Sequence, residues 1–78
     1  MNIELEDVDR LRHMLGVSER TPRGYRNYFA AGSNDQPSMA RLEAAGLVVR
    51  NRNWDLTTWP VYHATLDGAR LVGLQRLP

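Results

Sequence analysis

Apolar residues recur at helical spacing near the start of the chain. Leu5, Val8, Leu11 and Leu15 follow one another at steps of three or four, and most positions between them are charged. Residues three and four apart share one face of a helix, so this period predicts an amphipathic helix. Acidic residues at its start favour the helix dipole, and Gly16 can adopt the left-handed conformation that ends a helix.

Aromatic residues dominate the stretch that follows. Proline, glycine and hydroxyl residues first predict a loop over residues 18–24. The next segment, GYRNYFAAG, fits a short helix or a strand. We predict the helix, with Tyr25, Tyr28 and Phe29 packed into the core, because a small domain needs large side chains inside.

A third helix has the clearest signals at both ends. Asp35 can cap it, Pro37 suits its first turn, and Gly46 can end it. One face of this helix carries the apolar side chains of Met39, Leu42 and Ala45.

Strand patterns occupy the last third of the chain. Residues 47–50 form a short run with two β-branched valines, and residues 60–65 alternate, so we predict two strands joined by a wide hairpin. Thr65 can then cap a closing helix over residues 66–74, whose core-facing residues would be Leu66, Ala69, Val72 and Leu74. Gly68 and Gly73 weaken this helix, which suggests that another backbone packs closely against it.

These elements predict an α+β fold: helices plus a two-stranded β-hairpin in a single domain over residues 1–78. A chain of 78 residues with 42% hydrophobic and 24% charged residues has room for one core. We expect that core to bring together Leu11, Leu15, Leu42, Leu47 and Val72.

Candidate chemistry is sparse. Cysteine is absent, which excludes thiol catalysis and cysteine-based zinc sites. His13 and His63 lie far apart in the sequence, and no cluster with metal-ligand spacing or glycine-rich phosphate loop is present. We therefore expect no enzyme activity, no catalytic residue, no metal and no cofactor. No apolar run is long enough to span a membrane, so we expect a cytoplasmic protein without membrane contact.

Charge is unevenly distributed along the chain. All ten basic residues are arginine, and the net charge is +1. Residues 1–19 carry two arginines and five acids, residues 20–53 carry six and two, and residues 54–78 carry two and two. Arginine pairs bidentately with phosphate, so the basic middle of the chain is the candidate surface for an anionic partner.

Two segments resemble a known family. The run RLEAAGLVVR, a hairpin, and then YHATLDGARLV resemble the carboxy-terminal half of winged helix-turn-helix transcription regulators, particularly the MarR-like group. The resemblance covers residues 39–72. It implies a small winged helix-turn-helix-like domain whose third helix enters the major groove of DNA.

A second resemblance is more extensive. GYRNYFAAG, with Pro37 and the LEAAGLV segment behind it, is similar to small uncharacterised proteins of tailed bacteriophages and prophages. That similarity implies a phage-derived accessory protein acting in the host bacterial cell by binding, without a settled activity.

DNA binding is the function that these observations favour. Double-stranded DNA would be contacted from the third helix, from the base of the wing and from the segment before the aromatic helix. The candidate nucleic-acid-binding residues are Arg23, Arg26, Gln36, Ser38, Arg41, Arg50 and Arg52. Against this hypothesis, alanines occupy positions of the third helix where a sequence reader would carry Arg, Asn or Gln.

Protein binding is the alternative. Trp54 and Trp59 flank the polar tip of the predicted hairpin. If exposed, these side chains are natural anchors for a host or phage protein or for a homodimer.

Overall fold

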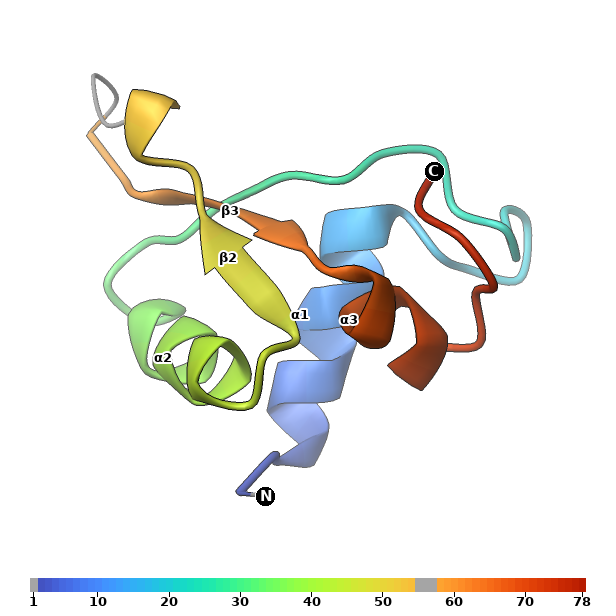
Figure 1. The fold of residues 1–78 in the computed structure, drawn as a ribbon, viewed down its shortest axis with the longest axis horizontal. Coiled ribbons are helices and arrows are strands. Elements are labelled where there is room, and N and C mark those ends of the chain that lie inside the picture. The colour runs from blue at the N-terminus through green and yellow to red at the C-terminus, as the bar shows by residue number, and fades with distance from the viewer. Residues whose placement is uncertain (1, 55–57) are drawn as a thin grey trace.

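The computed structural model describes residues 2–54 and 58–78, and Figure 1 shows their arrangement. A three-stranded sheet packs against α1, with α2 beside one end of the sheet and α3 beside the other (Figure 1). The elements are α1 (Leu5–Leu15), β1 (Phe29–Ala30), α2 (Gln36–Ala44), β2 (Val48–Arg50), the 3-10 turn η1 (Arg52–Trp54), β3 (Val61–Ala64) and α3 (Leu66–Leu71). The α+β class is thus confirmed. Residues 55–57 of the predicted hairpin tip lie outside the described residues.

The sheet has one strand more than predicted. The order is β1-β3-β2, and both pairs are antiparallel. β2 and β3 form the predicted hairpin, with Val49 opposite His63. β1 adds to the other edge of β3, with Phe29 opposite Tyr62. The prediction of a two-stranded hairpin alone is therefore wrong.

The first helix is confirmed. Gly16 closes α1 in the left-handed conformation at φ 67°, as predicted. Leu5, however, is 76% exposed, so the apolar face is shorter than the sequence period suggested. The carboxylate of Asp7 is fully buried on the face that turns inward.

The predicted aromatic helix is wrong. Residues 24–28 run in an extended path across the carboxyl end of α1 and lead into β1. The backbone N–H of Tyr25 donates to Leu15 O at 3.0 Å, and that of Tyr28 donates to Met14 O at 3.3 Å. These bonds satisfy carbonyls that a helix end leaves without partners, and they replace the internal bonds a helix would have made.

The two later helices follow their sequence signals with one difference. The Thr65 hydroxyl accepts a hydrogen bond from the backbone N–H of Gly68, which is the predicted cap of α3. Asp35 precedes α2 without capping it, because its carboxylate instead accepts from Arg10 Nε at 2.8 Å. Leu66 was predicted to face the core but is 40% exposed.

The hydrophobic core joins α1, α2 and the inner face of the sheet. Four of the five residues predicted to meet there, Leu11, Leu15, Leu42 and Leu47, are buried in one cluster. Val72, the fifth, is partly buried and packs against it. Met14, Met39, Val48, Tyr62, Ala64, Ala69, Ala31 and Leu74 complete the cluster.

Gly68 and Gly73 are required for different structural reasons. A Cβ at Gly68 would meet the backbone oxygen of Leu47, which confirms the predicted close approach. Gly73 has open space around its Cα but adopts φ +92°, a conformation that other residues rarely adopt. No helix among the described residues has the length and apolarity required to cross a membrane.

Candidate nucleic-acid interface

The arginines fall into two groups. Arg10, Arg12 and Arg41 form ion pairs with carboxylates of α1 or of the turn before α2. The second group lies on segment 20–28 and consists of Arg23 and Arg26, which were predicted to bind nucleic acid, and their neighbour Arg20. Among the described residues, no carboxylate lies within ion-pair distance of these three arginines.

Arg41 lies at the centre of an internal network. Its Nε and Nη2 donate to the two carboxylate oxygens of Asp7, each at 2.8 Å, so the pair is bidentate. The hydrogen bond from Arg41 holds the pKa of Asp7 well below its usual range, against the opposing effect of burial. The same bond raises the pKa of Arg41. This guanidinium therefore joins α2 to α1.

Three carboxylates gather around that guanidinium. Carboxylate oxygens of Glu4, Glu6 and Asp7 lie within 4.8 Å of one another, in a geometry that could hold a metal ion. The prediction that no such cluster exists is wrong. Arg41 Nη2 lies 3.2 Å from Glu4, 3.2 Å from Glu6 and 2.8 Å from Asp7, and so supplies the positive charge that the cluster needs.

The predicted reading face of α2 is not a polar exposed surface. Ser38 is 2% exposed, and its hydroxyl accepts from Arg41 Nη2 at 3.3 Å. Gln36 is exposed, but its Nε2 donates to Ala31 O at 3.3 Å. Ser38 is therefore buried, whereas the Arg41 side chain is 30% exposed and its guanidinium is held by carboxylates. That these two residues contact DNA stays a prediction. The remaining exposed positions of α2 are Pro37, Ala40, Glu43 and Ala44.

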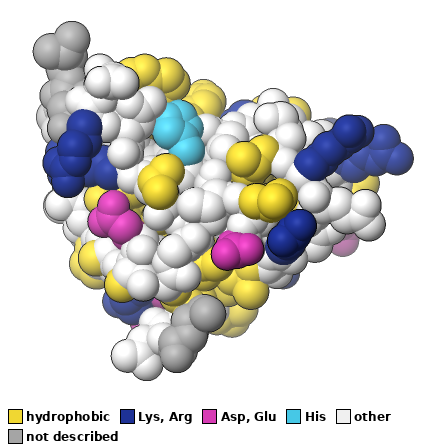
Figure 2. All heavy atoms as spheres, in the orientation of Figure 1, with side chains coloured by type: hydrophobic (Ala, Val, Ile, Leu, Met, Phe, Trp, Pro, Cys, Tyr) yellow, Lys and Arg dark blue, Asp and Glu magenta, His cyan; other side chains and the backbone are white. Residues whose placement is uncertain are grey.

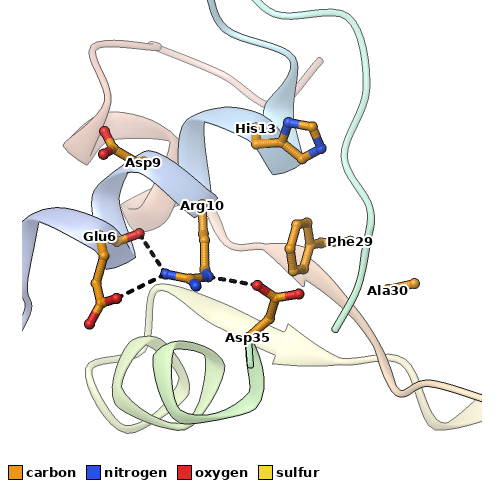
Figure 3. Close-up of a pocket in the computed structure, with 7 residues that line it drawn as sticks. All are labelled: Glu6, Asp9, Arg10, His13, Phe29, Ala30 and Asp35. Atoms are coloured by element: carbon orange, nitrogen blue, oxygen red, sulfur yellow. Dashed lines mark hydrogen bonds and ion pairs between the residues drawn. The ribbon is translucent and has the colours of Figure 1, made fainter. Parts of the chain in front are cut away.

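A shallow hollow between α1, β1 and the start of α2 also contains an arginine (Figure 3). Arg10 crosses it, with Nη1 3.3 Å from Glu6 and Nε 2.8 Å from Asp35. These bonds, first of all the one to Asp35, raise the pKa of Arg10. His13 packs edge-on against Phe29 with the ring centres 5.8 Å apart. Arg10, Glu6 and Asp35 of this hollow therefore bind one another.

Arg26 is held at the opposite end of α1. Its Nε and Nη2 donate to the backbone oxygen of His13 at 3.0 and 2.7 Å. A cation near the carboxyl end of a helix is stabilised by the helix dipole. An arginine has five N–H donors, so others remain for a ligand. The structure thus gives Arg26 a fixed position at the surface.

Two tyrosine rings lie close to this guanidinium. Its carbon lies 5.1 Å from the centre of the Tyr25 ring and 6.0 Å from that of Tyr28. Tyr25 is 63% exposed and Tyr28 51% exposed, so the prediction that they belong to the core is wrong. Phe29, by contrast, is partly buried against the core. We call residues Tyr25, Arg26 and Tyr28 the Tyr-Arg-Tyr surface.

A groove adjoins this segment. It runs between residues 22–24 and 73–78 and contains the side chains of Arg23 and Arg76. Both arginines are exposed. The groove therefore extends the basic character of the segment toward the end of the chain.

The segment from β2 to β3, which corresponds to the predicted wing, carries the other predicted residues. Arg52 is exposed at the start of η1, and Arg50 is half-buried at the end of β2. Trp54 and Trp59 are 47% and 44% exposed, and the Trp54 ring lies edge-on to His63 with the centres 5.1 Å apart. Figure 2 shows apolar side chains across the middle of one face, while Lys/Arg side chains gather mainly toward its margins.

The sequence did not predict the residues that join segment 24–28 to strand β3. The Asn27 amide donates to Ala64 O at 3.1 Å and accepts from Ala64 N at 2.6 Å, so it continues the β1–β3 ladder with a side chain. His63 Nδ1 bonds to Asn27 O, and its Nε2 bonds to Asn51 Nδ2 at 2.8 Å. The only sequence signal for this contact was an asparagine, Asn27, between Arg26 and Tyr28, and nothing in the sequence pattern indicated that it would bond to Ala64.

The histidines have structural contacts. His63 lies within the asparagine network, and the His13 ring packs on Phe29. The absence of enzyme activity stays a prediction.

Comparison with known proteins gives no match to a protein-family model, to a curated protein or to a solved structure. The winged-helix and phage resemblances, and the cytoplasmic location, accordingly stay predictions.

Proposed function

We propose that this protein binds DNA through its sugar-phosphate backbone, as a winged-helix-type domain without enzyme activity. The contacts come from Arg20, Arg23 and Arg26 on one segment and from Arg52 on the wing. Helix α2 is not the reader of the sequence in this proposal. Binding would therefore depend on phosphate charge more than on base identity.

The observation that carries the proposal is the division of the arginines. Those on α1 and α2 are neutralised by carboxylates at 2.8 to 3.5 Å. Those on the 20–28 segment have none within ion-pair distance among the described residues. In Figure 1 that segment and η1 both lie toward the upper side, whereas α2 and the amino end of α1 lie toward the lower side. Unpaired guanidinium groups are the ones able to displace counterions from phosphate.

The winged-helix part of the proposal rests on topology. The strand order β1-β3-β2, with α2 before β2 and a hairpin between β2 and β3, is compatible with that fold. One feature departs from a helix-turn-helix, in which a turn of three or four residues joins two helices. Here residues 16–35 separate α1 from α2. This departure agrees with a binding mode that does not insert α2 into the major groove.

Salt dependence tests the proposal. Four phosphate contacts predict that log K for a labelled duplex falls with log salt at a slope of about −3.6, from about −0.9 per contact. Replacing Arg23 and Arg52 by alanine should make the slope shallower by about 2. Arg70→Ala on α3 removes one exposed arginine that is not among the proposed contacts, and it serves as the control when the change of slope is compared per arginine removed.

Two results would contradict the proposal. One is the absence of duplex binding at about 50 mM salt, where phosphate contacts are strongest. The other is an equal loss of slope per arginine in the Arg70→Ala control, which would show that only net charge matters.

Protein binding is the second candidate function. It is favoured by the exposure of Trp54, Trp59 and Val49, which are 47%, 44% and 50% exposed on the wing and β2. A host or phage protein, or a second copy of the chain, would then bind with little salt dependence. Trp54→Ala would weaken such a complex by about 2 kcal/mol or more.

A further inference from the structure

The Tyr-Arg-Tyr surface contains more than phosphate binding requires. Two aromatic rings, 63% and 51% exposed, lie near a guanidinium that is held by two hydrogen bonds to His13 O. Burial of such rings was the expectation from size alone, so their exposure on an ordered segment needs another explanation. The backbone explains it in part, because Asn27, between Arg26 and Tyr28, bonds to β3.

We infer that this surface binds the unpaired bases of a DNA strand, with Tyr25 and Tyr28 stacking on bases and Arg26 contacting phosphate. The inference rests on the proposed function and narrows its ligand to DNA with single-stranded character. Proteins that bind single strands combine a basic path for the backbone with aromatic side chains on which bases stack. In a duplex the faces of the bases are stacked on one another, so exposed tyrosines have no comparable partner there.

The geometry supports stacking in three ways. Arg26 contacts the two rings at 5.1 and 6.0 Å, which restrains both side chains before a ligand arrives. Tyr25 also packs over Gly16, where a Cβ would lie 2.6 Å from a ring carbon, and this contact further restrains a ring that stays 63% exposed. Arg23 and Arg76 line the adjoining groove and offer a path for the phosphates that follow.

Charge complementarity selects the strand over an apolar partner. Residues 20–28 contain three arginines and no acidic residue. An apolar protein surface would leave those guanidinium groups without water or counter-charge, which is unfavourable. A single DNA strand supplies both: its phosphates carry negative charge for the arginines, and its bases are flat rings for the tyrosines.

The experiment compares a labelled oligothymidine with a duplex of the same length. The wild-type chain should bind oligothymidine more tightly than the duplex. Tyr28→Ala and Tyr25→Ala should each weaken oligothymidine binding by about fivefold or more, the lower end of what loss of one stacked ring produces. Neither variant should change duplex binding by more than about twofold.

Controls separate stacking from folding. Tyr28→Phe keeps the ring and should bind like the wild type, while Leu71→Ala removes a 46% exposed apolar side chain on α3 and should have no effect. Circular-dichroism melts of every variant verify the fold. Because Tyr25 packs over Gly16, Tyr28→Ala decides the test if Tyr25→Ala unfolds.

The outcomes distinguish the two proposals. Arginine-dependent binding of the duplex, with oligothymidine bound no more tightly and no effect of Tyr28→Ala, overturns the stacking inference and leaves the proposed function standing. Failure of the wild-type chain to bind either DNA overturns both.

Discussion

The two ends of α1 use the same side chain for different purposes. At the amino end, the Arg41 guanidinium is bound by Asp7 at 2.8 Å and joins two helices. At the carboxyl end, Arg26 hydrogen-bonds only to a backbone oxygen among the described residues and lies close to two exposed tyrosine rings. The comparison teaches that a count of arginines overstates the surface available to an anion. Each charge has to be assigned to the interior or to the surface by its partner.

The largest expected effect lies at the amino end. Asp7→Ala removes the two hydrogen bonds between Asp7 and Arg41, and loss of a hydrogen bond to a charged group costs about 1.5–3 kcal/mol of unfolding free energy. The Arg41 guanidinium keeps Glu4 and Glu6 at 3.2 Å. Asp9→Ala is the matched control on the same helix, because that carboxylate is 66% exposed and its pair with Arg12 spans 3.5 Å. It should cost about 1 kcal/mol or less. Urea denaturation measures both, and equal losses would refute the internal role of Asp7.

Acid should weaken the same pair. The folded-state pKa of Asp7 is depressed, chiefly by the hydrogen bond from Arg41, so its contribution to stability is complete above the unfolded pKa of about 3.9. The contribution is lost as pH falls below that value toward the folded pKa. Unfolding free energy measured from pH 6 down to pH 2 should therefore fall more steeply for the wild type than for Asp7→Asn. Parallel curves would contradict the assignment.

A moderate loss of stability is expected from replacing Asn27, which lies on the segment that crosses the carboxyl end of α1. Asn27→Ala removes the side-chain partners of Ala64 N and Ala64 O, and leaving part-buried backbone groups unbonded costs about 1–3 kcal/mol. Asn34→Ala is the matched control, since Asn34 is exposed and only its backbone oxygen accepts from Arg10. Thermal melts should separate the two variants. A melt of Asn27→Ala that coincides with the control would show that the amide does not hold the segment.

The smallest effect on stability is expected at Arg23. Its guanidinium has no ion pair among the described residues, so Arg23→Ala should shift unfolding free energy by no more than about 0.5 kcal/mol. The same substitution should weaken DNA binding and lower its salt dependence. A large loss of stability would contradict this assignment, because it would show that Arg23 stabilises the fold as the carboxylate-paired arginines do.

Local signals predicted the parts of the fold that depend on neighbours in sequence. The period of α1, its end at Gly16 and the Thr65 cap of α3 each involve contacts within a few residues, and all three are confirmed. Segment 24–28 was assigned wrongly because its backbone bonds to the carbonyls of α1 and its Asn27 amide bonds to Ala64, thirty-seven residues away.

In the candidate site, too, the contacts that are distant in sequence were the ones that the sequence did not predict. Arg23, Arg26 and Arg52 have their guanidinium groups on loops and turns, where no long-range carboxylate among the described residues reaches them. Ser38 and Arg41 were placed on a DNA-facing surface because their partner Asp7 lies thirty-four residues from Arg41 in the chain. The exposure of Tyr25 and Tyr28 could not be predicted either, since it follows from the extended path that Asn27 fixes.

Mapping the DNA contact by NMR tests the division of surfaces most directly. Backbone amide resonances of the labelled chain would be followed while DNA with a single-stranded segment is added at low salt. Shifts concentrated in residues 20–28 and 50–54, with residues 36–44 of α2 unmoved, are the expected result. Shifts concentrated in α2 would contradict it, because they would place the DNA on the helix whose arginine and serine face inward.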